Sequence, residues 1–206
     1  MNRQIIAISG GGFSTEENAY IDQYLLKIPR KQDRLKITFI ATASNDAQGY
    51  IGKFYEAFKE EEPSHLTIQD FALDHVQEMV NASDIIYVGG GNTQYMLTVW
   101  RETGFDNVLK QAYEQGVILA GISAGALCWF ERCYSESHDD GFEEFQGLGI
   151  LQGTFCPHYN DKKRQVAFDQ WTSKQDNMFT YALNDNESLH FINEQVVAKI
   201  RSYTND

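Results

Sequence analysis

Ser123 lies at the centre of the pentapeptide GISAG, residues 121–125, which has the G-x-S-x-G pattern of a nucleophile elbow. The apolar run 116–122 precedes this serine and a helix-compatible run, 124–130, follows it, as the motif requires. A sharp strand–turn–helix connection lifts a serine hydroxyl clear of the sheet, and the flanking glycines let neighbouring backbone come close. The same pattern also suits a glycine-rich connection in which the serine only caps a helix. The pentapeptide alone therefore predicts either a nucleophile or an N-cap.

A serine nucleophile needs a base within hydrogen-bond reach, and that base usually needs a carboxylate to orient it. His158 is the best placed of the five histidines, because it follows Cys156-Pro157 at the end of an expected strand and precedes an expected helix. The carboxylate stays open at this point. Glu136 and Asp139 both lie between the serine and the histidine, in a loop expected after the elbow helix, with Asp140, Glu143 and Glu144 as further options.

A second glycine run, residues 89–91, follows the expected strand 84–88 and opens a helix. Glycines allow backbone N–H groups to point into a site with no side chain in the way. One of these groups, paired with the N–H of Ala124, would form an oxyanion hole for acyl transfer. A phosphate-binding loop is the competing interpretation. However, no lysine follows this run as in G-x-x-x-x-G-K-[ST], and glycines 10–12 lack the third glycine of G-x-G-x-x-G.

Alternating strands and helices are expected to position these groups. The expected strands are 4–9, 35–41, 65–71, 84–88 and 117–121, and the expected helices are 14–27, 47–60, 73–81 and two within 93–116 that separate at Gly104. This alternation predicts an α/β fold with a mainly parallel sheet flanked by helices on both faces, so that the strand ends bearing the site share one edge.

The last third of the chain has a different pattern. We expect a polar loop over 131–144, short strands at 149–153 and 154–156, a helix at 161–171, and a hairpin-rich ending built from 179–183, 188–192 and 196–200. The turn 184–186, Asn-Asp-Asn, separates the first two of these last strands. No linker divides the chain, so we expect one catalytic domain over residues 1–206.

Composition excludes several classes of function. The 206 residues carry a formal net charge of −12, which argues against a nucleic-acid partner and against an anionic membrane surface. No targeting segment is evident before the first expected strand, and no run reaches the roughly 18–20 apolar residues of a membrane helix. An odd number of cysteines without paired close spacing predicts reduced packing residues and a cytoplasmic protein; the cysteines are Cys128, Cys133 and Cys156. No metal site or cofactor site is evident.

Taken in order, four segments of the chain resemble peptidase family S51, which holds dipeptidase E, the aspartyl dipeptidase, and cyanophycinase. The anchors span most of the chain and are ISGGG at 8–12, VGGGNT at 88–93, GISAGA at 121–126 and PHY at 157–159. The G-G-G-N-T and S-A-G-A strings in this order are more specific together than either is alone. The resemblance implies a class I glutamine-amidotransferase-like three-layer α/β sandwich, with serine where the amidotransferases carry cysteine.

The resemblance also implies a catalytic triad in the order serine, acid, histidine. Ser123 would be the nucleophile and His158 the base, and the N–H groups of Gly91 and Ala124 would form the oxyanion hole. The acid would lie in the loop after the elbow helix, where Glu136 fits best and Asp139 stays an alternative.

We therefore expect a cytoplasmic serine peptidase that hydrolyses small peptides without metal or cofactor, similar to dipeptidase E. The cations at 162–164, Lys-Lys-Arg, either meet a substrate carboxylate or form a solvated helix face. Two alternatives remain at this point: a catalytically inactive binding or regulatory protein of the same fold, and a cyanophycinase-like hydrolase acting on an acidic polymer. The side-chain specificity and the oligomeric state cannot be predicted from these patterns.

Overall fold

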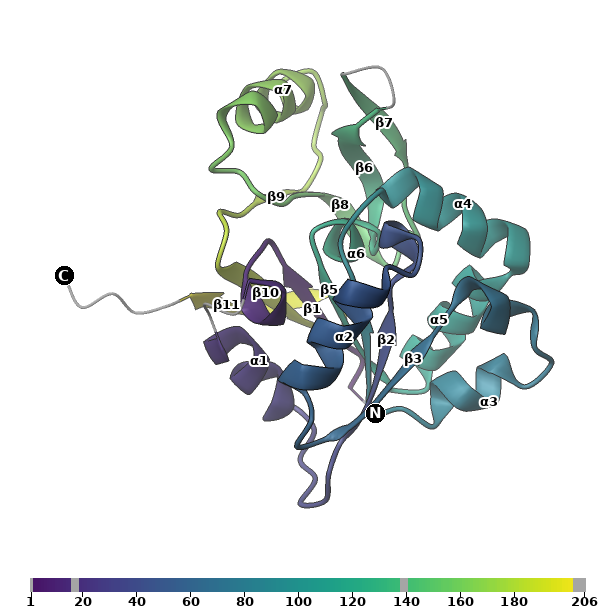
Figure 1. Ribbon diagram of the computed structural model, residues 1–206. Helices are drawn as coiled ribbons and strands as arrows, with labels where there is room; N and C mark the ends of the chain where they lie inside the picture. Colours follow the sequence, from purple (N-terminus) through teal and green to yellow (C-terminus); the bar gives the residue numbers. More distant parts are fainter. Residues whose placement is uncertain (1, 16–18, 138–140, 202–206) are drawn as a thin grey trace.

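The computed structural model describes residues 2–15, 19–137 and 141–201. Its larger sheet has the strand order β11 (Gln195–Arg201), β10 (Glu187–Ile192), β1 (Gln4–Ile8), β5 (Ile118–Ile122), β4 (Ile85–Val88), β2 (Lys36–Ile40) and β3 (Glu62–Leu66) (Figure 1). The five strands from β1 to β3 run parallel, whereas β10 is antiparallel to β1 and β11 is antiparallel to β10. The expected mainly parallel sheet is therefore confirmed.

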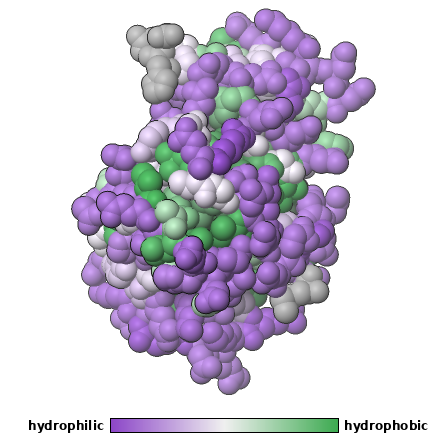
Figure 2. Space-filling model, turned by 90° about the vertical axis from the view of Figure 1, so that its right-hand side faces the viewer, coloured by the Kyte–Doolittle hydropathy of each residue, from purple (hydrophilic) through white to green (hydrophobic). Residues whose placement is uncertain are grey.

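Helices cover both faces of this sheet, which explains why its strands are almost continuously apolar. One face packs against α1 (Ala19–Leu26) and α2 (Gln48–Ala57), and the other packs against α3 (Val76–Asn81), α4 (Thr93–Thr103) and α5 (Phe105–Glu114) (Figure 1). Alternate residues of β1 serve opposite faces: Ile6 and Ile8 join the core under α1 and α2, whereas Ile5 and Ala7 join the other core. Seen from the right of Figure 1, the surface has apolar residues gathered near its middle and hydrophilic residues around them (Figure 2).

Helix boundaries follow the sequence patterns with local exceptions. Gly104 ends α4 with φ 76° and leads into α5, which confirms the expected break. The expected helix 14–27 is shorter, since α1 begins at Ala19 after a 3₁₀ turn at Gly12–Ser14, and residues 16–18 lie outside the described part of the chain. The third strand is shifted from 65–71 to Glu62–Leu66 because a 3₁₀ turn, Ile68–Ala72, takes up the rest of the segment.

A second, smaller sheet lies above the carboxyl edge of the first (Figure 1). Its strand order is β7 (Phe142–Gln146), β6 (Phe130–Glu136), β8 (Leu151–Cys156) and β9 (Thr180–Ala182), and it carries α7 (Lys162–Thr172). The expected polar loop over 131–144 is therefore wrong in its described part. The elbow helix α6 (Ala124–Leu127) is short, and β6 and β7 pair as an antiparallel ribbon across which Arg132 and Glu144 form an ion pair.

The end of the chain links the two sheets. Segments 188–192 and 196–200 form the expected hairpin, β10 and β11, but this hairpin joins the larger sheet beside β1. The preceding strand, β9, joins the smaller sheet beside β8. Residues 183–186 must therefore cross from one sheet to the other, and they do so at the edge where β1 and β5 end.

All three cysteines are buried and free, as expected of packing residues. Within the described residues, no helix has both the length and the apolar character needed to cross a membrane.

Candidate active site

Ser123 directly follows β5 and adopts φ 55° and ψ −113°, a left-handed conformation that side chains rarely take. Its N–H donates to Ile8 O at 2.9 Å, which ties the turn to the end of β1. The flanking glycines are required by close packing. A Cβ at Gly121 would lie 2.0 Å from the Gly125 carbonyl oxygen, and one at Gly125 would lie 2.3 Å from the Val88 carbonyl oxygen. The sharp elbow expected from the pentapeptide is present.

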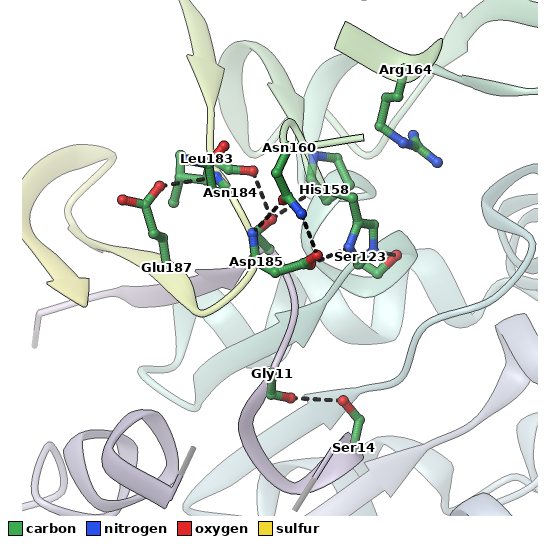
Figure 3. A network of polar contacts seen from close by, with 12 residues as sticks. Gly11, Ser14, Ser123, His158, Asn160, Arg164, Leu183, Asn184, Asp185 and Glu187 are labelled. Atoms are coloured by element: carbon green, nitrogen blue, oxygen red, sulfur yellow. Dashed lines mark hydrogen bonds and ion pairs between the residues drawn. The ribbon is translucent and has the colours of Figure 1, made fainter. Parts of the chain in front are cut away.

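His158 reaches this serine from the other sheet, because it stands two residues after the end of β8. Its Nε2 lies 2.9 Å from Ser123 Oγ (Figure 3). The His158 backbone is also left-handed, with φ 53°. The side chain of His158 is 33% exposed. The structure therefore contains the expected contact between the serine and the histidine.

Asp185 occupies the other side of the imidazole. Its Oδ1 lies 2.5 Å from His158 Nδ1 (Figure 3). An ionised carboxylate only accepts hydrogen bonds, so Nδ1 carries the proton and Nε2 is left as the acceptor for the serine hydroxyl. Asn160 holds Asp185 at two points: its Nδ2 donates to the carboxylate oxygen Oδ2 at 3.0 Å, and its Oδ1 accepts from the Asp185 backbone N–H at 2.8 Å. Asp185 is thus held in the position that an orienting acid needs.

Glu136, the expected orienting acid, forms a different pair. Both of its carboxylate oxygens contact the Arg164 guanidinium. Burial raises the pKa of Glu136, but Arg164 and hydrogen bonds from its surroundings outweigh that effect, so its pKa lies below the ordinary value. The expected Glu136–His158 pairing is corrected by this geometry, because β6 continues to Glu136 as one strand of the β6–β7 ribbon. The alternative acid, Asp139, lies outside the described residues.

The glycine run 89–91 lies against the serine, as expected of an oxyanion loop. A Cβ at Gly90 would be 3.2 Å from Ser123 Cβ, and one at Gly91, where φ is 140°, would be 2.2 Å from the Ala43 carbonyl oxygen. Asn92 then caps α4 through its side chain. Ala124 is the first residue of α6, where N–H groups have no intrahelical acceptor. These two backbone segments lie next to Ser123, where the sequence predicts an oxyanion hole.

A cavity of about 550 Å³ opens beside these groups. Its wall includes Ser123, His158 and Asp185 together with the glycine turn 10–11 and Tyr50. Burial raises the pKa of Tyr50 to about 12, so its hydroxyl stays neutral near pH 7, and it accepts a hydrogen bond from the Gly90 N–H at 3.3 Å. Among the described residues, no lysine or arginine lines this cavity.

The three candidate substrate cations on α7 do not line this cavity either. Arg164 is paired with Glu136, and Lys162 donates to Gln165. Lys163 is likewise absent from the cavity wall. Over the described ranges, no group of three His, Cys, Asp or Glu side chains is arranged to hold a metal ion.

Two further residues of the site were not predicted: Asp185 and Asn160. Asp185 lies in the Asn-Asp-Asn stretch that the sequence marks only as a turn. The available signal was its position directly after an expected strand, since strand ends at this edge carry the other site residues. Asn160 follows His158 by two residues, and its type alone does not distinguish a clamp from an ordinary loop residue.

Comparisons with known proteins show the family of the chain. Residues 5–199 match the model of peptidase family S51. The chain is 44% identical over 204 residues to the uncharacterized peptidase YgaJ of Bacillus subtilis, covering 97% of this chain and 88% of that protein. It is 25% identical over 190 residues to the uncharacterized peptidase Lin0382 of Listeria innocua, covering 87% of this chain and 85% of that protein.

Solved structures show the same fold. A putative peptidase E protein from Listeria monocytogenes EGD-e superposes with a TM-score of 0.74 at 19% identity, covering 98% of this chain and all of that one. A peptidase from an acI-B1 actinobacterium gives a TM-score of 0.65 at 17% identity, covering 91% and 82% of the two chains. The expected class I glutamine-amidotransferase-like fold is thereby confirmed. The expected class of enzyme, a serine hydrolase of the S51 type, is confirmed by the family match. The chain belongs to peptidase family S51.

Proposed function

We propose that this chain is a serine peptidase that cleaves small peptides through a triad of Ser123, His158 and Asp185. The observation that carries the proposal is the unbroken hydrogen-bonded series from Ser123 Oγ to His158 Nε2, and from His158 Nδ1 to the Asp185 carboxylate. This is the arrangement by which serine hydrolases activate a weak nucleophile, and it is recognised by geometry and not by chain order. The order here is serine, histidine, acid.

In the first half of the reaction, Ser123 Oγ attacks the scissile carbonyl carbon while its proton passes to His158 Nε2. The N–H groups of Gly91 and Ala124 donate to the oxygen that becomes negatively charged. Asp185 stabilises the imidazolium that forms. The tetrahedral intermediate then collapses as His158 gives its proton to the leaving amine, and an ester with Ser123 remains.

In the second half, water attacks the ester and loses a proton to His158 Nε2. Collapse of the second tetrahedral intermediate breaks the bond to Ser123 Oγ, which recovers its proton from His158. Every proton transfer in this sequence uses a side chain already within hydrogen-bond reach. The proton transfers therefore need no protein group besides the triad.

The cavity beside the triad supports small peptides as substrates. Its volume of about 550 Å³ falls in the range of small-molecule pockets. The described part of its wall carries no lysine or arginine, so it gives no support for a cyanophycinase-like groove that follows an acidic polymer. The contact of Asp185 with His158 favours an active enzyme over an inactive binding or regulatory protein of the same fold. We place the enzyme in the cytoplasm, on the support of its three buried, unpaired cysteines.

Hydrolysis of a dipeptide panel tests the proposal, with Asp-Xaa beside Asn-Xaa, Glu-Xaa, Ala-Xaa and Leu-Xaa. The wild type should cleave at least one member, and Ser123→Ala should lower kcat by about 10⁶-fold, because the nucleophile is removed. A fluorophosphonate should label the wild type at Ser123, as read by peptide mass spectrometry. Full activity of Ser123→Ala would refute the mechanism, and the pattern of cleaved dipeptides decides whether the specificity resembles that of dipeptidase E.

A further inference from the structure

Ser9 is a fully buried serine directly after β1, and neither the cavity nor the proposed chemistry uses it. The sheet fixes its backbone, because β1 lies between β5 and β10 and the Ser9 N–H donates to the Glu187 carbonyl at 3.0 Å. The position of its hydroxyl is thus determined by an interior strand of the larger sheet.

Both hydrogen-bonding capacities of this hydroxyl are used, and each joins Ser9 to a different segment of the site. Ser9 Oγ accepts from the His158 backbone N–H at 2.7 Å and donates to the Leu183 carbonyl at 2.8 Å. The Leu183 carbonyl also accepts from the Tyr159 N–H at 2.9 Å. One hydroxyl therefore connects the larger sheet to the loop that carries the imidazole and to the segment that leads to Asp185, which lie side by side in Figure 3.

The backbone of His158 needs such support. Its φ of 53° is a sparsely populated conformation for a non-glycine residue, and such conformations persist only where the surroundings hold them. The Ser9 hydroxyl is the acceptor of the N–H of this residue. The turn that follows Ser9 is shaped to the same pair, since a Cβ at Gly10 would lie 2.1 Å from Asp185 Oδ1 and 3.1 Å from His158 Cε1.

We propose that Ser9 is a positioning residue of the triad: its hydroxyl holds the His158 backbone and the segment before Asp185 in register with the Ser123 elbow. This inference rests on the proposed function, in which the imidazole acts as the base. Ser9 lies outside the cavity wall and touches no substrate, so it acts only through the placement of the imidazole.

The test compares Ser9→Ala with Ser83→Ala. Ser83 is also a buried serine whose hydroxyl is hydrogen-bonded, to Thr38 Oγ1 at 2.7 Å, but it precedes β4 at the opposite edge of the larger sheet. Ser9→Ala should lower kcat by about 10–100-fold with KM within about twofold, because small misplacements of a catalytic group have effects of that size. The rate constant for phosphonylation of Ser123 should fall by the same factor. Ser83→Ala should leave both rates unchanged.

Circular dichroism at the assay temperature checks that each variant is folded. If Ser9→Ala does not fold, Ser9→Cys replaces it, because a thiol keeps a side chain of similar shape but is a weak hydrogen-bonding group. It should show the same loss of kcat and of labelling rate. Wild-type rates in a folded Ser9 variant, or an equal loss in Ser83→Ala, would overturn the inference.

Proton NMR separates this inference from the proposed function, because it needs no turnover. The Nδ1 proton shared by His158 and Asp185 should give a downfield resonance in the wild type that shifts or broadens in Ser9→Ala and persists in Ser83→Ala. An unchanged resonance in Ser9→Ala would refute the positioning role. A wild type that shows the resonance, yet cleaves no peptide and takes no label, would refute the proposed function instead.

Discussion

The two edges of the larger sheet each carry a cavity with a histidine, and only one of them has the groups for acyl transfer. At the carboxyl edge, His158 lies between a serine hydroxyl and a carboxylate. At the amino edge, a larger cavity of about 870 Å³ includes His190, whose ring nitrogens contact Tyr24 Oη at 2.8 Å and Gln4 Oε1 at 3.0 Å. Both imidazoles are fully hydrogen-bonded, so hydrogen bonding alone does not make a histidine catalytic.

The two cavities differ in the charge of the groups that contact the histidine and in the backbone turns around it. A carboxylate stabilises an imidazolium, whereas the neutral partners of His190 do not, and burial lowers the pKa of His190. The carboxyl edge also gathers the tight turns after β1, β4 and β5, where glycines let backbone N–H groups approach a ligand. Charge and backbone geometry, and not cavity size, therefore distinguish the edge at which we propose the chemistry.

The largest effect is expected when each of the two histidines is replaced by alanine. His158→Ala should lower kcat by about 10⁴–10⁶-fold, because both the base and the leaving-group acid are lost. His190→Ala should keep kcat/KM within about twofold and destabilise the fold by about 1–3 kcal/mol, because Tyr24 and Gln4 lose their buried partner. Steady-state kinetics and urea unfolding measure the two effects. A loss of activity that is equal in both variants would break the comparison.

The next test concerns the two carboxylates that competed for the role of acid. Asp185→Asn should lower kcat by about 10³–10⁴-fold, since an amide can stabilise the wrong imidazole tautomer and cannot balance an imidazolium charge. Glu136→Gln is the matched control and should stay within about threefold of the wild type, because Glu136 contacts Arg164 and not His158. The opposite ranking of these two kcat values would restore Glu136 as the acid.

A smaller effect is expected where the glycine turn meets Asp185. In Gly10→Ala the new methyl group would lie 2.1 Å from Asp185 Oδ1, so the carboxylate must move, and kcat should fall by about 10–100-fold. Gly49→Ala in α2 meets nothing within 4 Å; it should stabilise the helix by about 0.5–1 kcal/mol and leave kcat unchanged. Kinetics and thermal melts distinguish the two, and unaltered kcat in Gly10→Ala would show that the turn does not constrain the acid.

The smallest effect is the pH dependence of stability, which has opposite signs at the two edges. Burial raises the pKa of Asp22, under the glycine turn, to about 7, although a hydrogen bond from Phe13 acts against this. The folded state then holds a proton that the unfolded state releases, so this contribution to stability is lost as pH rises from about 4 to 7. His190 acts in the reverse direction, because its lowered pKa removes stability as pH falls below about 6.5.

Asp22→Asn should therefore raise the melting temperature above about pH 7, by an amount that corresponds to about 1–2 kcal/mol, and should change little near pH 4. This amount is smaller than the full pKa shift implies, because the side chain of Asp22 is partly exposed. Melting curves at pH 4, 6 and 8 measure the difference. A gap between variant and wild type that does not grow with pH would contradict the buried state of this carboxyl.

The parts of the site that are local in sequence were predictable. Ser123 and the glycine run 89–91 each carry a short pattern whose meaning depends only on the adjoining strand and helix. His158 was found from its position between a strand end and a helix start. The main sheet was predictable for a similar reason, since strands covered on both faces are continuously apolar, as in β4 and β5.

Asp185 was not predictable, because its role depends on two strands that join different sheets. Residues 180–182 and 187–192 both have short apolar patterns, and nothing in them shows that β9 belongs to the smaller sheet while β10 belongs to the larger one. The β6–β7 ribbon was missed for a related reason. Its outer residues are charged, so the alternation that marks a strand is hidden by solvated side chains.

The proposed triad spans both sheets: Ser123 follows a strand of the larger one, His158 follows a strand of the smaller one, and Asp185 lies on the crossing between them. Sliding of one sheet over the other by an ångström or two would separate the base from its nucleophile while leaving each sheet intact. The catalytic rate should therefore depend on the relative position of the two sheets. On heating, we expect activity to be lost when the two sheets shift relative to each other, before either sheet unfolds.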